Sequence, residues 1–472
     1  MDMIRVMMIT QDLGWSDTDM GLAARTAWTV QLCGKGRMQA ALAYMKKQAD
    51  ETETVRDGVL CCPVSTRMKL TTLWDEWEST REDLLRVIAS FRPDVIHVFG
   101  SEWIYGAVAK EVRVPVVIHM LGFLTVYYTA LELVRRESVP PPKGRLSRLA
   151  ERMTGKGRKR NRADPQRDAE RTTERISGIE RDIMRMNRYF MGRTQWDRMI
   201  VRYYAPGAVY FHVEEVIRPK VYDAAGTWTG SAGGRLRLLT ISSGDLRKGS
   251  EIILRTAKIL RDVVCTDFEW RVAGDPESFR CITQAPGIRP DEVNVKSLGV
   301  LDAGQIIGEL QRADLFIHPS VIDNSPHAVC EAQLIGCPVI ASRVGGLTDL
   351  IEDGATGFLY PYNEPHTLAF LIDGVCRRAG ERERVSQNAL REALRRHDPG
   401  RIAEDLYRVY RDVVKDYETG QDSQGHQVPE KERTGVHMVE VQDPGAAEPE
   451  PLDPENHASV TQGGGRAEAE TV

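Results

Sequence analysis

The chain lacks the features that mark membrane-spanning, secreted and zinc-binding proteins. None of its apolar runs approaches the length needed to cross a bilayer, and the short apolar stretch that follows Asp2 is too short for a signal-peptide core. Eight cysteines are present, none of them in a C-x-x-C pair. We therefore expect a cytoplasmic protein with reduced thiols, with a zinc site at Cys61 and Cys62 as a minor alternative.

No charge of one sign dominates either. The formal net charge is -5, so the chain as a whole gives no reason to expect nucleic acid as a partner. Two segments deviate from this balance. A basic insertion at 140–171 carries eleven Lys or Arg residues against four acids, which fits either a solvated loop or peripheral association with an anionic membrane at its inner face. Residues 418–472 are acidic and poor in apolar side chains, which predicts a disordered tail.

Short apolar runs alternate with helical patterns through most of the chain. The runs 4–9 and 95–99 predict strands in a first half, and the runs 236–241 and 338–341 predict strands in a second half. Strands that alternate with helices indicate βαβ units and a parallel sheet. We predict an α/β protein with two Rossmann-like, doubly wound domains at 1–220 and 221–400.

The segment from His318 to Gly346 carries the chemistry, as strand, loop, helix, strand and loop. Ser325 suits a helix N-cap and Pro326 suits the first helical position. The amides at that helix N-terminus, with its positive dipole end, favour an anion. Gly345-Gly346 predicts a second backbone cradle before a short helix, and two such termini facing one crevice suit a diphosphate.

Two carboxylates are spaced eight residues apart in this segment. Asp323 is expected in the loop and Glu331 in the helix, where both could accept hydrogen bonds from sugar hydroxyls. The alternative is that Asp323 caps the turn and Glu331 is a solvated helix residue, because an isolated D-x7-E spacing is a weak signal.

The order of these motifs resembles the retaining glycosyltransferases of family 4, the E-x7-E type with the two-domain GT-B fold. Residues 92–102 resemble a strand end of these enzymes, and residues 192–197, with Glu214 and Arg218, resemble a bacterial-type subgroup of them. The resemblance covers about residues 1–415 apart from the insertion. In the second half it rests on Pro319-Ser320, Asp323, Glu331-Ala332, Gly336 to Ser342, Gly345-Gly346, and Gly354 with Gly357.

The resemblance implies a transferase that moves a sugar from a nucleotide-diphosphate sugar to a glycan or lipid-linked glycan, with retention and without metal or other cofactor. The first domain would face the acceptor and the second would bind the donor. A helix at 401–417 would pack back on the first domain. Glu331 would hold the ribose, Asp323 the donor sugar, and Lys248 would neutralise the diphosphate.

Three departures from the family pattern affect the candidate residues. Asp323 is one methylene shorter than the usual Glu. Ser243 stands where the family has an Arg, for which Arg247 would substitute. The usual glycine pair after the first strand is absent, so Gly14-Trp15 or Gly21 would serve instead. The family also has a His after a first-domain strand, for which the candidates are His119 and His97; His119 is assigned, although counting from Pro115 places that position nearer Leu121. The catalytic set is thus Asp323, Glu331, Lys248 and His119, and the donor-binding set is Ser243, Gly244, Arg247, Lys248, Asn324, Ser325, Pro326, Glu331, Gly345, Gly346 and Gly14.

Three other functions fit parts of the sequence. Asp17-Thr18-Asp19 could hold a divalent cation in a single-domain, metal-dependent transferase. A sugar-nucleotide epimerase or a phosphorylase could use the same two-domain architecture. The departures at Asp323 and Ser243 fit a non-catalytic protein that binds nucleotide sugars.

Overall fold

The computed structural model describes most of the chain up to Ser423. The described residues are 3–11, 20–34, 36–47, 52–66, 73–138, 165–231, 233–242, 246–264, 266–276, 279 and 287–423.

The first domain is built on an eight-stranded sheet with the order β3-β4-β2-β1-β5-β6-β7-β8. All neighbouring strands run parallel except β3, which pairs antiparallel with β4. The strands are β1 (Ile4–Thr10), β2 (Met38–Lys47), β3 (Thr54–Arg56), β4 (Val59–Thr66), β5 (Val95–Phe99), β6 (Val116–His119), β7 (Tyr189–Gly192) and β8 (Val209–His212). The main helices are α1 (Leu22–Cys33), α2 (Leu73–Phe91), α3 (Leu124–Ser138), α5 (Pro165–Met186) and α6 (Gln195–Tyr204).

Both faces of this sheet are buried, which explains why its strands read as continuous apolar runs. Met7 and Ile9 of β1 belong to the core on one face, and Val6 and Met8 belong to the core on the other. The alternation follows from the period of two in a strand. The predicted strand at 4–9 is therefore confirmed, and the observed strand extends one residue further, to Thr10.

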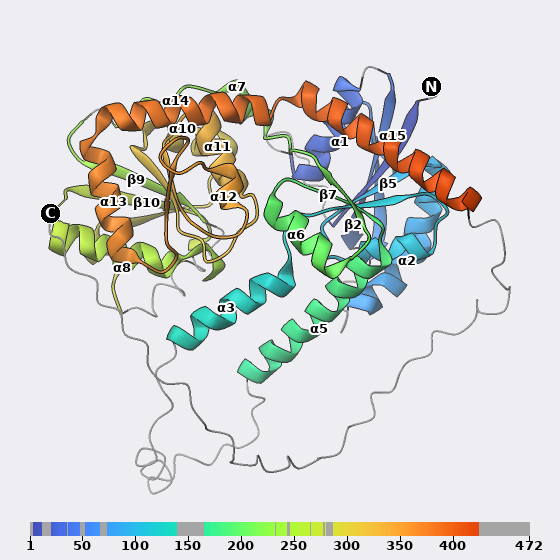
Figure 1. Cartoon of the computed structure of the whole chain (residues 1–472), viewed down its shortest axis with the longest axis horizontal. Coiled ribbons are helices and arrows are strands. Elements are labelled where there is room, and N and C mark those ends of the chain that lie inside the picture. Colours follow the sequence, from blue (N-terminus) through green and yellow to red (C-terminus); the bar gives the residue numbers. More distant parts are fainter. Residues whose placement is uncertain are drawn as a thin grey trace, which may run out of the picture. The chain divides into compact units, whose positions relative to one another are not determined.

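The second domain is built on a six-stranded, fully parallel sheet with the order β11-β10-β9-β12-β13-β14. Figure 1 shows its helices on both faces, so the predicted pair of doubly wound α/β domains is confirmed. The strands are β9 (Leu236–Ile241), β10 (Phe268–Ala273), β11 (Val295–Gly299), β12 (Leu315–His318), β13 (Val339–Ser342) and β14 (Phe358–Tyr360). The helices are α7 (Pro219–Asp223), α8 (Ser250–Ile259), α10 (Ala303–Arg312), α11 (His327–Ile335), α12 (Leu347–Leu350), α13 (Pro365–Arg377) and α14 (Ala379–Arg396).

The last helix, α15 (Pro399–Ser423), returns to the first domain (Figure 1). Its residues Ile402, Leu406 and Tyr410 are buried in the same core as Val6 and Met8 of β1. The helix runs six residues beyond the predicted start of the tail. The rest of the acidic tail, and residues 140–164 of the basic insertion, lie outside the described residues.

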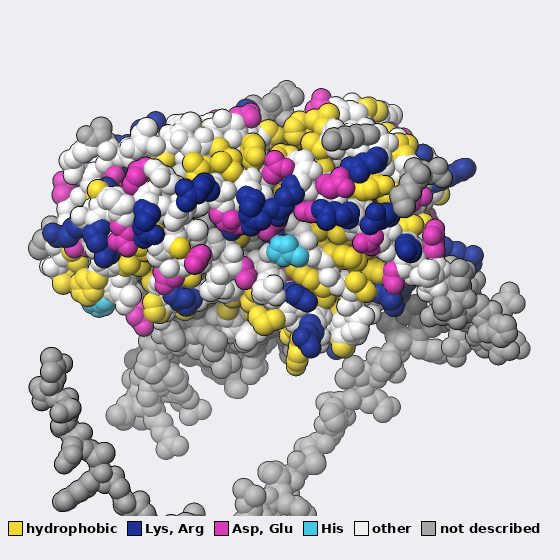
Figure 2. All heavy atoms as spheres, turned by 45° about the horizontal axis from the view of Figure 1, so that its top comes forward, with side chains coloured by type: hydrophobic (Ala, Val, Ile, Leu, Met, Phe, Trp, Pro, Cys, Tyr) yellow, Lys and Arg dark blue, Asp and Glu magenta, His cyan; other side chains and the backbone are white. Residues whose placement is uncertain are grey.

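The described surface and helices bear on three further expectations. None of the described helices combines the length and the apolar character that crossing a bilayer requires. On the face drawn in Figure 2, Lys and Arg side chains are interspersed with Asp and Glu, as suits a net charge of -5. Cys61 and Cys62 are buried on β4, and burial raises the pKa of the Cys62 thiol to about 12. That shift disfavours the thiolate that zinc would need.

Candidate active site

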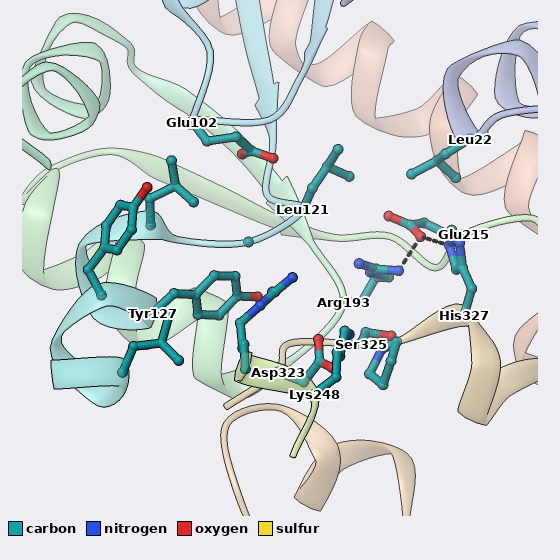
Figure 3. A pocket seen from close by; sticks show the side chains of 16 residues that line it. Leu22, Glu102, Leu121, Tyr127, Arg193, Glu215, Lys248, Asp323, Ser325 and His327 are labelled. Atoms are coloured by element: carbon teal, nitrogen blue, oxygen red, sulfur yellow. Dashed lines mark hydrogen bonds and ion pairs between the residues drawn. The ribbon is translucent and has the colours of Figure 1, made fainter. Parts of the chain in front are cut away.

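A cavity of about 580 Å³ lies where the carboxyl ends of strands from both sheets meet. This volume suits a small-molecule ligand, and the carboxyl ends of parallel strands are where such ligands bind in α/β sheets. Figure 3 shows Glu102, Tyr127 and Arg193 of the first domain and Lys248 and Asp323 of the second around this cavity. The lining residues are Leu22, Glu102, Leu121, Gly122, Leu124, Tyr127, Tyr128, Leu131, Arg193, Glu215, Arg247, Lys248, Asp323, Ser325, Pro326 and His327.

Lys248 and Asp323, both predicted from the sequence, form an ion pair at the cavity wall. Lys248 Nζ lies 2.5 Å from Asp323 Oδ2, and the same oxygen lies 3.0 Å from His318 Nε2 and 3.1 Å from Ser320 Oγ. Burial alone would raise the pKa of Asp323, but Lys248 and His318 hold it far below the usual value. Asp323 is therefore ionised at every physiological pH, and its charge is balanced by a neighbouring cation.

A close backbone approach brings Lys248 to this position. Gly249, which precedes α8, has φ 71°, and a Cβ atom there would overlap the carbonyl oxygen of Pro319. Only glycine tolerates both the left-handed conformation and the contact. The amide of Val321 also donates to the carbonyl of Arg247, at 2.7 Å. The turn that carries Arg247 and Lys248 is thereby fixed against the loop that carries Asp323.

The start of α11 differs by one residue from the prediction. Pro326 is the N-cap rather than the first helical residue, and the helix begins at His327. Ser325 is therefore not the cap, and its buried Oγ has no hydrogen-bond partner among the described residues. Because Ser325 and Pro326 both line the cavity, the hydroxyl and the positive end of α11 remain available to an anion.

Gly345 and Gly346 support the loop from behind rather than line the cavity. The amide of Gly346 donates to the carbonyl of Asp323 at 3.0 Å, and Cβ atoms at the two glycines would overlap the carbonyls of Asp323 and Asn324. The Gly346 amide is therefore occupied, and the helix that follows, α12, has only four residues. These contacts give the two glycines a supporting role, and a second anion cradle at this turn stays a prediction.

Asn324 connects the two domains. Its Oδ1 accepts a hydrogen bond of 2.6 Å from Thr194 Oγ1, and its Nδ2 donates to Asp197 Oδ2 at 3.2 Å. Nearby, the amide of Gln195 donates to Asp349 Oδ2 at 2.8 Å. The predicted donor-binding residue Asn324 thus contacts the first domain directly, and its side chain does not line the cavity.

Glu331 is buried in a two-point ion pair with Arg218. The Oε1 and Oε2 atoms lie 2.7 Å and 2.6 Å from Arg218 Nε and Nη2. Such a fork-to-fork pair is the strong form of this interaction. Glu331 does not line the cavity described above, so a ribose bound by Glu331 would lie beyond it and share the carboxylate with Arg218.

His119 lies behind the cavity wall. Its Nε2 is 3.0 Å from Glu215 Oε1 and its Nδ1 is 3.0 Å from Nε2 of the buried His97. His97 in turn contacts the Tyr410 hydroxyl of α15 at 2.8 Å. Leu121, the position that counting from Pro115 favours, is the one that lines the cavity. His119 is therefore placed to hold Glu215 rather than to touch a ligand.

Sequence reasoning missed a buried charge cluster centred on Glu215. This carboxylate pairs with Arg193 and with His327 Nε2, the latter at 2.7 Å, as Figure 3 shows. Burial opposes ionisation, yet Arg193, His119 and His327 keep the pKa of Glu215 well below its usual value. Since His327 belongs to α11, the cluster is a second connection between the two domains.

Glu102 is the last residue of the segment 92–102, for which the sequence predicted no role, and it lines the cavity opposite Lys248 (Figure 3). Its Oε2 atom is buried and has no hydrogen-bond partner in the described part of the chain. Burial raises the pKa of Glu102 to about 7, and the nearby Glu180 adds to the shift. One signal could have found it: like Arg193 after β7, Glu102 is a charged residue just past the end of an apolar strand, β5.

Several candidates cannot be placed. Ser243, Gly244, Gly14 and the Asp17-Asp19 pair lie outside the described residues. Among the residues that are described, no group of three or more His, Cys, Asp or Glu side chains is arranged to hold a metal ion.

Sequence comparisons match parts of this chain to known glycosyltransferases. A family model described as "Glycosyl transferases group 1" matches residues 229–392. A relative from Mycobacterium leprae, named phosphatidyl-myo-inositol mannosyltransferase, is 32% identical over 143 residues, which make up 30% of this chain and 36% of that protein. The curated relatives are matched over only 29% to 44% of their own length.

The structural comparisons cover both domains. Sucrose-phosphate synthase from Thermosynechococcus elongatus superimposes with a TM-score of 0.66 at 14% identity, over 88% of this chain and all of that one. HepE from Anabaena, in a complex with UDP and glucose, superimposes with a TM-score of 0.58 at 14% identity, over 87% of this chain and all of that one. At this identity the likeness shows the fold, which is the two-domain GT-B architecture.

Proposed function

We propose that this protein is a glycosyltransferase that moves a sugar from a nucleotide-diphosphate sugar to a hydroxyl of a glycan or lipid-linked glycan, with retention of anomeric configuration. One observation carries the proposal: the Lys248–Asp323 pair, inside the segment matched by the group 1 glycosyltransferase model, faces a cavity whose other wall belongs to the first domain. A donor bound on one wall would meet an acceptor bound on the other.

The cations and dipoles on the second-domain wall suit a leaving diphosphate. When the sugar–phosphate bond breaks, negative charge develops on the diphosphate, and preorganised donors aimed at that charge lower the barrier. Lys248, the Ser325 hydroxyl and the positive end of α11 face the cavity together. Arg247, which also lines it and lies 4.5 Å from the Tyr127 ring centre, would contribute a further cation in place of the Arg that the family has at Ser243.

Retention follows in this proposal from attack on the same face of the sugar that the diphosphate leaves. The leaving phosphate takes the proton of the acceptor hydroxyl, so no protein nucleophile is needed. The surroundings of Asp323 agree, because its Oδ2 already contacts Lys248, His318 and Ser320. We propose that Asp323 instead orients the donor sugar through its hydroxyls.

The first test is donor binding. Isothermal calorimetry with UDP, GDP and ADP, followed by their sugars, identifies the base and the sugar, and the UDP complex of HepE makes UDP the first probe. We expect one of the three nucleoside diphosphates, together with its sugars, to bind at micromolar concentration. Binding to none of the three would contradict the proposal.

The same donor distinguishes the other functions considered. An epimerase would change the donor sugar without an acceptor, and a phosphorylase would need inorganic phosphate. A non-catalytic protein would bind the donor without turnover. We also propose that no metal takes part, since Lys248 and Arg247 can neutralise the diphosphate, and full activity in a chelator is the expected result.

The basic segment adds a proposal about location. Seven excess positive charges between 143 and 171 would attract an anionic membrane, where a lipid-linked acceptor lies, at about 1 kcal/mol per Lys or Arg near the surface. Sedimentation with vesicles of rising anionic-lipid content should show binding that high salt removes. Binding that survives deletion of 143–171 would refute this role.

A further inference from the structure

The first domain forms a second wall of the cavity, called here the acceptor wall. Its chemistry differs from that of the second-domain wall with Lys248 and Asp323, called here the donor wall. Glu102, Leu121, Leu124, Tyr128 and Leu131 of the first domain line the acceptor wall. The aliphatic and aromatic side chains offer an apolar surface, and Glu102 offers a carboxylate. A pyranose ring carries both matching features, since its C–H face is apolar and its edge carries hydroxyl groups.

The Glu102 carboxylate is held in place by a backbone that only glycine allows. Gly100 has φ +92°, and a Cβ atom there would lie 2.7 Å from the Glu102 carboxyl carbon. The side chain folds back over this glycine toward the cavity, and its buried Oε2 has no hydrogen-bond partner among the described residues. Burying an unsatisfied polar atom costs free energy, which a ligand donating a hydrogen bond would recover.

A neighbouring carboxylate shows what a structural role looks like in the same region. Glu180 of α5 accepts from the amides of Leu124 and Thr125 at 2.9 and 2.8 Å, and from the hydroxyls of Thr125 and Ser101 at 2.8 and 3.4 Å. It therefore caps the N-terminus of α3 and both of its oxygens are occupied. Glu102 has fewer donors: the amides of Ser101 and of Glu102 itself hydrogen-bond to its carboxylate, and its Oε2 has no partner among the described residues.

We propose that Glu102 is the acceptor-binding residue of this cavity, that it accepts a hydrogen bond from a hydroxyl of a neutral sugar, and that it excludes phosphorylated acceptors. This inference rests on the proposed function. The exclusion follows from charge: an acceptor phosphate would face the Glu102 carboxylate, with Glu180 close behind it. The cations among the described lining residues are placed elsewhere. Arg193 is paired with Glu215 and Lys248 with Asp323, and Arg247 lies over the Tyr127 ring toward the donor wall.

The binding test uses neutral and phosphorylated sugars as probes. The protein saturated with UDP is titrated with methyl glycosides of glucose, galactose and mannose, and with glucose 6-phosphate and mannose 6-phosphate, while tryptophan fluorescence is followed. Trp103 is adjacent to Glu102 and Trp196 stacks on Tyr127, so both report on this wall. We expect at least one neutral glycoside to bind, and more tightly than its 6-phosphate. In Glu102→Gln its affinity should fall about tenfold or more, with UDP affinity retained.

A stability measurement separates a ligand-binding carboxylate from a structural one. Glu102→Gln should raise Tm at pH 8, because it removes a carboxylate whose ionisation is opposed mainly by burial. The matched variant Glu180→Gln should lower Tm, because it removes an acceptor that four donors use. A lower Tm in Glu102→Gln, or binding in which the 6-phosphates are preferred or no neutral glycoside binds, would overturn the inference. Failure of the wild-type protein to bind UDP, GDP and ADP alike would instead contradict the proposed function; where GDP or ADP is the nucleotide that binds, it replaces UDP in this titration.

Discussion

Two carboxylates on opposite walls of the cavity, Asp323 and Glu102, differ in their partners. On the second-domain wall Asp323 is paired with Lys248, and behind that wall Glu331 is paired with Arg218. On the first-domain wall Glu102 leaves a buried oxygen without a partner among the described residues. A paired carboxylate is charge-balanced before any ligand arrives, whereas an unpaired one gains its partner from the ligand.

This contrast suggests that the donor wall and the acceptor wall contribute differently to ligand binding and catalysis. On the donor wall a nucleotide diphosphate would meet a cation already fixed in place, so little rearrangement is needed when charge develops on the leaving group. On the acceptor wall the buried Oε2 of Glu102, without a partner among the described residues, destabilises the empty protein and favours a ligand with a hydroxyl in the right place. The donor wall would then set the rate, and the acceptor wall would set specificity.

The largest expected effect comes from removing the Lys248 cation from the donor wall. Lys248→Ala should lower turnover by about two to three orders of magnitude, because the cation meets charge that develops in the transition state. The donor KM should change less than tenfold. Steady-state kinetics checks both numbers, and wild-type turnover would contradict the role.

A stability control is needed because the same substitution leaves Asp323 buried without its main partner. Lys248→Ala should lower the free energy of unfolding by up to about 3 kcal/mol. The double variant Lys248→Met with Asp323→Asn removes both charges and should recover part of this loss without recovering turnover. Lys258→Ala, at an exposed pair with Asp262, serves as the neutral control.

A smaller effect is expected from the second paired carboxylate, Glu331. If it holds the ribose, Glu331→Ala should weaken UDP binding about 10- to 100-fold, because a charged hydrogen bond is worth about 1.5–3 kcal/mol. Arg218→Met is the matched variant, since it removes the other half of the pair. A purely structural pair would instead give equal losses of Tm in the two variants and unchanged UDP affinity, as calorimetry would show.

The smallest effect concerns pH and sharpens the comparison at Glu102. Burial raises the pKa of this carboxyl from 4.5 to about 7, with Glu180 of α5 adding to the shift and Arg247 opposing it. The protonated carboxyl therefore contributes to the free energy of unfolding. This contribution is fully present below pH 4.5 and is lost as pH rises through about 7. The acceptor KM should fall up to about tenfold between pH 6 and pH 8. A profile that is equally steep in Glu102→Gln would assign the titration to another group.

Most of the fold could be predicted because strands buried on both faces are recognisable as apolar runs. The strands at 236–241 and 95–99 match their predicted bounds. The helix at α11 was misplaced by one residue, because Pro326 can serve either as N-cap or as first helical residue and the sequence does not distinguish the two. The length of α15 was underestimated, because its last turn is polar and resembles the start of a tail.

The site was predictable where it depends on local order and not where it depends on contacts across the chain. Lys248, Asp323, Ser325 and Pro326 line one cavity as the motif implied. Partners more than a hundred residues away carry no local signal: Glu215 meets His327, and Arg218 meets Glu331, only in the folded chain. The position of His119 behind Glu215 likewise depends on its register in β6.

The measurement that tests the central claim most directly is a proton NMR time course of the protein with its nucleotide sugar, in the presence and absence of a neutral methyl glycoside. We predict a new anomeric signal only when both are present, with the configuration of the donor sugar retained and the nucleoside diphosphate released in equal amount. A product of inverted configuration, conversion of the donor alone, or a bound donor that never reacts with any acceptor would contradict the account.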